Sequence, residues 1–555
     1  MLREIFAEYW EHEMKSSPTW ATRLGDRRYE NHLEDRTEAG RKADEAKRRE
    51  FLDRARSTTA ATPDESLDLA VFEHMIEDHL DGLPFNEHVL PMDQLWGVHM
   101  TPLELPSFHP TDDREGLEHL VQRYEDFSRL MDESIECMRE GIELGVVHPR
   151  IISEKLLAQV RPQADTGANV EQGPMWRPFA SIPAQVDGAE RIAQGARAAI
   201  KGAVVPAFGR LVRFLEDEYV PVSREGVGLC ALADGEARYA HAVRQQTTTT
   251  LTADEIHQVG LDEVSRIRDE MRQVMGSAGF HGSMEAFNEF LRTDRRFYFE
   301  REEQLLDGFR SILDAVEGRL PEVFGRLPKQ PFEIVPIESY RAADAPEAYY
   351  CQPAQDGSRP GQFYANTHEP QTRPRWGMES LAYHEAVPGH HLQIALAQEL
   401  EHLPMFRRHG PFTAYIEGWA LYSEALPKEL GFYTDRYSDF GRLTNELWRG
   451  VRLVVDTGLH HLGWSRQAAM DYFRENTAIT DSNIEAEVDR YIVMPGQALS
   501  YKIGELRILG IRKRAEAAVE NFDIRSFHDR LLGGGALPLD VLDRWMDTWI
   551  EAEQA

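Results

Sequence analysis

The feature that most limits the fold of this chain is a proline-glycine pair, Pro388-Gly389, inside the segment 381–399 (LAYHEAVPGHHLQIALAQE), which otherwise favours helix. Proline has no amide hydrogen to donate to the carbonyl oxygen of His384, four residues earlier. Glycine accepts backbone angles that other residues resist. The pair therefore predicts a break or a bulge in the helix at this point.

The same segment concentrates side chains that bind metal ions and transfer protons. His384 and Glu385 precede the break, and His390 and His391 follow it. Neutral imidazole is the commonest protein ligand of zinc, and a His-Glu pair with a second histidine on the same helical face marks a class of zinc hydrolases. The segment therefore predicts a zinc site, in which Glu385 is the general base.

The spacing of these histidines departs from the usual motif. The second histidine normally comes four residues after the first, and this chain has Pro388 there. A regular helix cannot bring a later histidine back to His384, but a break can absorb the extra residues. We therefore predict that His384 and His390 bind zinc, and His391 is the alternative second ligand.

A catalytic zinc usually has three protein ligands and one open position. The segment 413–424 (TAYIEGWALYSE) predicts a neighbouring helix. The residues that flank Glu417 are apolar, which argues against the alternative that Glu417 is an ordinary surface carboxylate. We predict Glu417 as the third ligand, with Gly418 allowing close helix packing. Glu424 is the candidate for a second carboxylate that orients a ligand histidine.

Polar residues further along the chain are candidates for the rest of the site. Arg452, Asp456 and His460 lie on one side of an apolar helix and predict either a buried ion network or, through His460, a donor to the substrate carbonyl. Tyr501 is a candidate donor to the developing oxyanion. Arg507 is a candidate for binding a carboxylate of the substrate or of the protein.

Short aromatic and β-branched runs before the histidine cluster predict a small antiparallel sheet beside the zinc-binding helix. An edge strand of this sheet could pair with an extended substrate, and the alternative is a sheet that only packs beside the helix. We assign Tyr364 and Asn366 to substrate binding. The predicted strands and turn are 332–335, 348–352, the turn 354–361, and 362–366.

The rest of the 555-residue chain has helical periodicity, so the predicted fold class is mainly α: a large helical bundle with a deep cleft. We expect one metallopeptidase-like unit, possibly in two lobes, with a helical lobe at 1–250 and the zinc site and sheet at 251–555. The net charge of −32 argues against a nucleic-acid partner. The oligomeric state cannot be predicted.

Three distant cysteines without a CxxC pair argue against a disulfide framework. The first residues, MLREIFAEYWEHEMKSS, lack the apolar run of a signal peptide. No stretch approaches the about 18 uninterrupted apolar residues that indicate a membrane span. We therefore expect no membrane partner and a cytoplasmic location.

Four motifs together, YHEAVPGHHLQ, YIEGWALYSE, RLVVDTGLH and PGQALSYKIGELRI, resemble the bacterial domain-of-unknown-function family 885 (DUF885). That family is similar to the helical gluzincin metallopeptidases of the thimet-oligopeptidase and angiotensin-converting-enzyme type. The resemblance implies a mainly helical fold with a deep cleft. In several of those enzymes a glycine precedes the second ligand histidine. The residues that the resemblance implies are His384, His390 and Glu417 as ligands, Glu385 as base, and Tyr501 or His460 beside the oxyanion.

We therefore expect a zinc metallopeptidase that hydrolyses peptides or oligopeptides. One alternative is a zinc hydrolase of a non-peptide amide or ester, which would use the same site chemistry. The other is a relative of such enzymes that binds peptides without catalysis. The sequence contains all three candidate residues, His384, Glu385 and Glu417, which argues against this last alternative.

Overall fold

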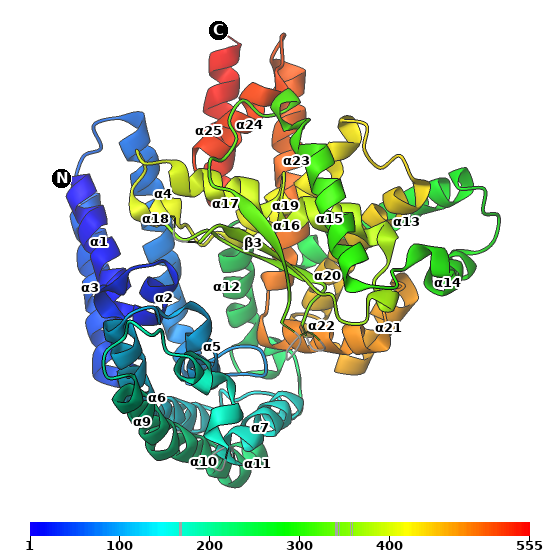
Figure 1. Cartoon of the computed structure of the whole chain (residues 1–555). Helices are drawn as coiled ribbons and strands as arrows, with labels where there is room; N and C mark the ends of the chain where they lie inside the picture. Colours follow the sequence, from blue (N-terminus) through cyan, green and yellow to red (C-terminus); the bar gives the residue numbers. More distant parts are fainter. Residues whose placement is uncertain (166–168, 339–341, 343–344, 356, 358, 555) are drawn as a thin grey trace. The chain divides into compact units, whose positions relative to one another are not determined.

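The computed structural model describes residues 1–165, 169–338, 342, 345–355, 357 and 359–554. Helices dominate it, and one small sheet accompanies them (Figure 1), which confirms the predicted fold class. Two residues of the predicted turn 354–361, Asp356 and Ser358, lie outside the described residues. No helix among the described residues is long and apolar enough to cross a membrane.

The chain forms two compact units. One consists of Met1–Ala60, Met75–Val227 and Ala231–Ala233. The other consists of Ala61–His74, Gly228–Cys230 and Asp234–Ala555, so it takes in segments that precede residue 251. The helix α4 (Pro63–Gly82) has residues in both units.

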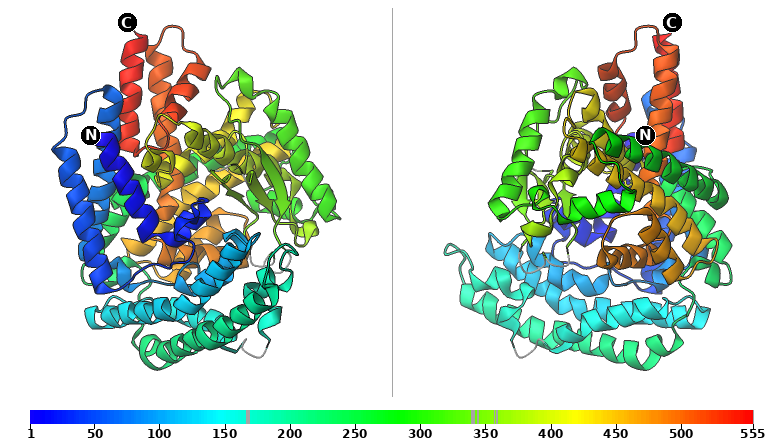
Figure 2. Two further views of the ribbon diagram at one scale, coloured as in Figure 1. Left: turned by 60° about the vertical axis from the view of Figure 1, so that its left-hand side comes forward. Right: turned by 90° about the vertical axis from the view of Figure 1, so that its right-hand side faces the viewer.

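The first unit is built around the long helix α6, in which an apolar stripe faces a core of aliphatic and aromatic side chains. The side chain of Asp113 caps the start of α6, and Gly145 ends it with a left-handed backbone conformation. The helices α6, α7, α9 and α10 lie side by side (Figure 2). The helices of this unit are α1 (Leu2–Ser16), α2 (Pro18–Arg23), α3 (Glu38–Arg56), α5 (Thr101–Phe108), α6 (Arg114–Leu144), α7 (Arg150–Asp165), α8 (Arg177–Ala180), α9 (Ala189–Ala199), α10 (Val205–Phe214) and α11 (Val220–Val222).

The second unit holds the histidine cluster and most of the long helices. Two helix pairs pack closely through glycines: Gly260 of α13 against α20, and Gly418 of α19 against Gly504 of α23. The helices are α12 (Gly235–Thr247), α13 (Ala253–Ser277), α14 (Met284–Thr293), α15 (Glu302–Glu317), α16 (Met378–Glu385), α17 (His390–Glu399), α18 (Met405–Arg408), α19 (Thr413–Glu429), α20 (Arg436–His460), α21 (Arg466–Asn476), α22 (Asp481–Val493), α23 (Ser500–Ala518), α24 (Ile524–Gly533) and α25 (Leu539–Glu553).

The sheet contains the strands β1 (Phe332–Pro336), β2 (Ala348–Cys351) and β3 (Gly361–Ala365), in the order β1-β3-β2. The strands β2 and β3 form an antiparallel pair, whereas β1 runs parallel to β3. The prediction of a wholly antiparallel sheet was therefore wrong in this detail. The reason is topological: the chain leaves β1 and crosses to the far edge before β2 begins, so only β2 and β3 form a hairpin.

Candidate metal centre

The break predicted at the proline-glycine pair separates two helices. Helix α16 ends at Glu385, α17 begins at His390, and the peptide bond before Pro388 is cis. The amide of Ala386 still donates to the carbonyl oxygen of Ala382 in α16. The amide of His391 donates to the carbonyl oxygen of Ala386 at 3.0 Å. The chain therefore turns sharply and starts a new helix within a few residues.

Gly389 makes this turn possible because the chain folds back against the end of α16. A Cβ atom at this position would lie 2.0 Å from the carbonyl oxygen of His384 and 2.3 Å from that of Tyr383. Both are backbone atoms, which cannot move aside, so only glycine fits. The close approach brings the ring of His390 to 4.7 Å from the ring of His384, measured between centroids.

Helix α19 holds the turn from the other side. The carbonyl oxygen of Pro388 accepts hydrogen bonds from the indole Nε1 of Trp419 at 2.9 Å and from the hydroxyl of Ser423 at 3.2 Å. Both donors belong to α19, and so does Glu417. Helices α16, α17 and α19 are packed against one another (Figure 1). The helix that supplies the carboxylate thus also fixes the turn between the histidines.

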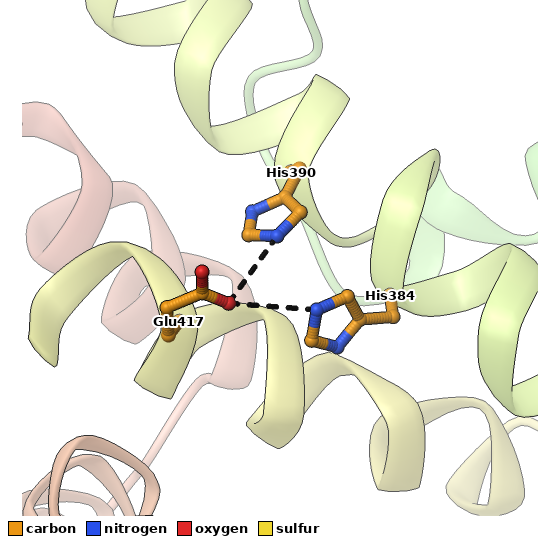
Figure 3. A group of neighbouring side chains, drawn as sticks. All are labelled: His384, His390 and Glu417. Atoms are coloured by element: carbon orange, nitrogen blue, oxygen red, sulfur yellow. Dashed lines mark ion pairs between the residues drawn. The ribbon is translucent and has the colours of Figure 1, made fainter. Parts of the chain in front are cut away.

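The structure brings together His384, His390 and Glu417. One carboxylate oxygen, Oε2 of Glu417, lies 3.6 Å from Nε2 of His384 and 3.5 Å from Nε2 of His390. Figure 3 shows both imidazoles turned toward this oxygen. The three potential ligand atoms lie within 4.8 Å of one another. The side chain of His384 is 5% exposed and that of Glu417 is 18% exposed, so the group is largely buried.

These distances suit a tetrahedral metal ion. Zinc ligands at the usual bond lengths and tetrahedral angles stand about 3.4 Å from each other. The separations of 3.5 and 3.6 Å match that spacing. Among the described residues, the buried Oε2 atom of Glu417 has no hydrogen-bond partner. An orphaned carboxylate oxygen that faces two imidazole nitrogens is the arrangement that a divalent cation completes.

The electrostatics of the group also favour a cation. Burial opposes the charged form of Glu417, but the electrostatic attraction of the nearby imidazoles of His384 and His390 outweighs it and holds the pKa of this carboxyl well below the usual value. Burial likewise opposes the charged form of His384, yet Glu417 and Glu424 raise its pKa to about 9. In the metal-free protein the site thus retains a proton, with which a metal ion would compete.

Glu424 orients the first histidine. Its Oε1 atom accepts a hydrogen bond from Nδ1 of His384 at 2.8 Å, and its other oxygen accepts one from the hydroxyl of Ser380. Arg449 lies 3.4 Å from the same carboxylate. Because Nδ1 is the donor in this bond, Nε2 is the ring nitrogen that faces Glu417, and it is the nitrogen that carries the lone pair when the ring is neutral. The predicted second carboxylate therefore contacts a ligand histidine.

Two candidate catalytic residues lie beside this group. Glu385, which follows His384 on α16, is half-buried, and its charge acts on His384. Tyr501 lies on α23, where burial raises the pKa of its hydroxyl and the charge of Glu417 raises it further. Helix α23 approaches α19 closely, since a Cβ on Gly418 would lie 2.5 Å from Gly504.

His391 and His460 do not join the group. The Nδ1 atom of His391 accepts from the hydroxyl of Tyr350 at 2.9 Å, and its Nε2 donates to the carbonyl oxygen of Gln330 at 3.0 Å. The ring of His460 bonds the backbone amide of residue 229 and, through Nε2, the carbonyl oxygen of Tyr491. Both rings therefore tie elements of the fold together, because their nitrogens already have backbone or hydroxyl partners.

The residues assigned to substrate binding also have partners within the protein. Arg507 forms ion pairs with Asp543 and, at 3.6 Å, with Asp540. The side-chain amide of Asn366 donates to three backbone carbonyls, at residues 342, 345 and 346. Tyr364 donates to a neighbouring glutamine and stacks on Tyr349 with a centroid distance of 4.6 Å. Arg507 and Asn366 thus have structural roles.

Sequence reasoning missed three residues that support the group. Trp419 and Ser423 bind the carbonyl oxygen of Pro388, and Ser380 bonds Glu424. The apolar character of α19 was visible in the sequence, but nothing there indicated a donor to the break. A signal for Ser380 existed in its position one helical turn before His384, on the same face of α16.

The chain belongs to the family described as "Bacterial protein of unknown function (DUF885)", whose model matches residues 18–546. No curated protein matches it. The solved structure of a "putative lipoprotein" from Colwellia psychrerythraea is 28% identical, with 99% of each chain covered and a TM-score of 0.95. That of a "putative lipoprotein of unknown function" from Shewanella oneidensis has the same fold at 16% identity, with 98% of this chain and 99% of that chain covered and a TM-score of 0.73.

A third solved structure, M32 carboxypeptidase from Deinococcus radiodurans R1, is 11% identical, with 93% of this chain and 90% of that chain covered and a TM-score of 0.41. This likeness is too weak to support a conclusion about function.

The cytoplasmic location predicted from the sequence was wrong. Both structures that match with a high TM-score are described as "putative" lipoproteins. The prediction rested on the absence of a signal-peptide run and of a membrane span in the given sequence, and such absences do not establish where a protein is located.

Proposed function

We propose that this protein is a zinc-dependent metallopeptidase that hydrolyses peptides or oligopeptides. The observation that carries the proposal is the convergence of two imidazole nitrogens, from His384 and His390, on one oxygen of Glu417 at the spacing of a tetrahedral site. A general-base candidate, Glu385, is the next residue after the first ligand. This combination is typical of enzymes that activate a water molecule for hydrolysis.

The chemistry divides between the ion and the chain. A zinc ion, when bound, lowers the pKa of a water molecule and polarises the carbonyl group of the substrate. Glu385 takes the proton from the attacking water and passes it to the leaving amine. Glu424 keeps His384 in the tautomer whose Nε2 faces the ion.

Tyr501 supplies the remaining function. Its phenol is half-buried on the side of Glu417, and burial and that carboxylate keep it protonated by raising its pKa. A protonated phenol can donate a hydrogen bond to the oxygen on which negative charge develops in the transition state. Loss of one such donor typically lowers kcat by about 100- to 1000-fold.

The test combines metal analysis with substrate profiling. Zinc content is measured by plasma mass spectrometry for the wild type, His384→Ala and Glu417→Ala, and a mixed peptide library is then digested with the zinc-loaded wild type. We expect about one zinc per chain in the wild type and loss of zinc in both variants. The cut positions show whether cleavage is internal or at the chain ends.

Glu385→Gln separates catalysis from metal binding. We expect this variant to retain zinc and lose peptide cleavage, because the amide cannot accept the proton of water. Glu401→Gln, which changes an exposed carboxylate after α17, is the matched control and should behave as wild type. A zinc-loaded wild type that cleaves no peptide, or an equally active Glu385→Gln, contradicts the proposal.

A further inference from the structure

Three arginines gather beside the metal group in a chain whose net charge is −32. Arg449 and Arg452 lie one turn apart on α20, and Arg490 lies on α22. Arg449 is only 9% exposed and Arg452 only 7%. Arginine is seldom buried to this degree without a carboxylate or phosphate partner.

Two separate contacts connect these arginines to the metal group. Arg449 lies 3.4 Å from the carboxylate of Glu424, which bonds the ligand His384. The guanidinium carbon of Arg452 lies 4.4 Å from the ring centroid of Tyr501, whose hydroxyl is within electrostatic reach of Glu417. The arginines thus lie one side chain away from the proposed reaction site, on the side of Tyr501.

The carboxylates around the arginines are shared among several groups. Glu487 is shared by Arg452 and Arg490, each with a nitrogen-oxygen distance of 3.1 Å. Glu424 is shared by Arg449 and a ligand histidine. Two further carboxyl groups act electrostatically on the arginines, Glu347 on Arg449 and Asp456 on Arg490. Each guanidinium group thus has a carboxyl group nearby, but these shared partners do not satisfy all of its N–H donors.

Several hydrogen-bond donors of these arginines have no partner. Within the described part of the chain, Nη1 of Arg452, Nε of Arg449 and Nε of Arg490 are buried and have no hydrogen-bond partner. A buried donor without a partner costs free energy, so such groups usually meet a ligand or water. A carboxylate from outside the protein would accept hydrogen bonds from these donors.

We propose that Arg452 and Arg449 bind a carboxylate of the substrate, so that the enzyme selects peptides with a negative charge close to the bond that is cleaved. The proposal rests on the proposed peptidase function. It assigns to these arginines the role that the sequence suggested for Arg507, which is paired with Asp543. The carboxylate can come from the C-terminus of the peptide or from an acidic side chain.

The first experiment compares three peptides of equal length and otherwise equal sequence. One has a free C-terminal carboxylate, one has a C-terminal amide, and one has the amide with glutamate as its last residue. We expect kcat/KM for at least one peptide with a carboxylate to exceed that for the plain amide by about 10- to 100-fold. The better of the two identifies the source of the carboxylate.

Equal cleavage of all three peptides overturns this inference and leaves the proposed function intact. Failure of the zinc-loaded enzyme to cleave both these peptides and the mixed library is a failure of the proposed function itself. A binding measurement separates the two cases further. Calorimetry with Glu385→Gln should show tighter binding of the carboxylate peptide than of the amide peptide. This measurement does not depend on peptide cleavage, and equal binding of the two peptides overturns the inference.

Variants locate the subsite. In Arg452→Gln we expect the preference for the carboxylate peptide over the amide to fall by about 10- to 100-fold. Arg452→Lys should restore part of it, because lysine keeps the charge but not the planar fork. Arg512→Gln on α23 removes an arginine paired with Glu429 and should keep the full preference.

Arg449→Gln is the second test if Arg452→Gln does not fold. Zinc content and melting temperature establish that each variant is intact before its preference is measured. If a folded, zinc-loaded variant of either arginine retains the wild-type preference, that arginine does not bind the carboxylate. Retention of the preference in both variants overturns the proposal.

Discussion

The indole nitrogen of Trp419 donates a 2.9 Å hydrogen bond to the carbonyl oxygen of Pro388, at the turn between the two candidate ligand histidines. This bond joins α19 to the turn, so it should affect metal binding more than overall stability. In Trp419→Phe we expect zinc affinity to fall by about 10-fold, as is usual for groups that orient ligands. Competition with a chelator of known affinity measures the change.

Tyr415→Phe is the control for that prediction. It also removes one buried hydrogen bond of α19, from the hydroxyl of Tyr415 to the carbonyl oxygen of Leu531 at 3.0 Å. Each variant should lose about 1 kcal/mol of stability. Only Trp419→Phe should bind zinc more weakly, and an equal loss of affinity in both would mean that the turn is not involved.

Gly389→Ala should abolish the metal site. The added Cβ would overlap the carbonyl oxygens of Tyr383 and His384, so α17 must move away from α16. We expect the free energy of unfolding to fall by about 3 kcal/mol. We also expect the variant to contain less than one zinc ion per chain. Gly377→Ala, where an added Cβ meets no atom within 4 Å, should leave both unchanged. Urea denaturation measures the stability of both variants, and metal analysis measures their zinc content. A normal zinc content in Gly389→Ala would contradict the described turn.

Glu424→Gln should weaken zinc binding without removing a ligand. The variant can still accept the Nδ1–H of His384 but no longer carries the charge that strengthens the imidazole as a ligand. We expect an affinity loss of about 10- to 100-fold. Glu429→Gln, on the same helix but exposed, should bind zinc as tightly as the wild type. Unchanged affinity in Glu424→Gln would show that Glu424 does not support the ligand.

Asp456 should make the protein less stable as the pH rises. Burial raises the pKa of its carboxyl from 3.8 to about 7, against the opposing hydrogen bonds from Tyr239 and the amide of Gly496. Because the pKa is higher in the folded state, the stabilising contribution is complete below about pH 3.8 and is lost as the pH rises through about 7. The full effect is at most about 4 kcal/mol.

Asp456→Asn provides the comparison, since an amide does not titrate. We expect the wild type to lose stability relative to Asp456→Asn between about pH 4 and pH 7, with little further change above that range, as measured by urea denaturation. Parallel stability curves for the two proteins over this range would show that Asp456 does not titrate there.

Local sequence signals predicted local structure well. The break predicted at Pro388-Gly389 separates α16 from α17, and the helix predicted at 413–424 forms as part of α19. The runs predicted as strands also form strands. Strand direction could not be predicted, because it depends on which edge of the sheet the chain reaches after β1.

Contacts between distant segments were harder to predict. Spacing alone could not decide between His390 and His391, because the answer depends on the backbone angles of the turn at Pro388-Gly389. The polar pattern around His460 was equally consistent with a buried ion network, and in the structure His460 is buried with hydrogen bonds to two backbone groups, the amide of Leu229 and the carbonyl oxygen of Tyr491. Arg507 was suggested as a carboxylate-binding residue only by its residue type. In the structure it forms an ion pair with Asp543 on α25.

The position of Glu417, Trp419, Ser423 and Glu424 on one helix has a consequence for assembly. The stretch that ends before residue 413 contains both histidines and the turn, yet the third candidate ligand, the donors to the carbonyl oxygen of Pro388 and the carboxylate that orients His384 all arrive with α19. Metal-binding competence should therefore appear in a single step, when α19 docks. A chain truncated before that helix would carry two of the three candidate ligands but none of the side chains of α19 that fix them.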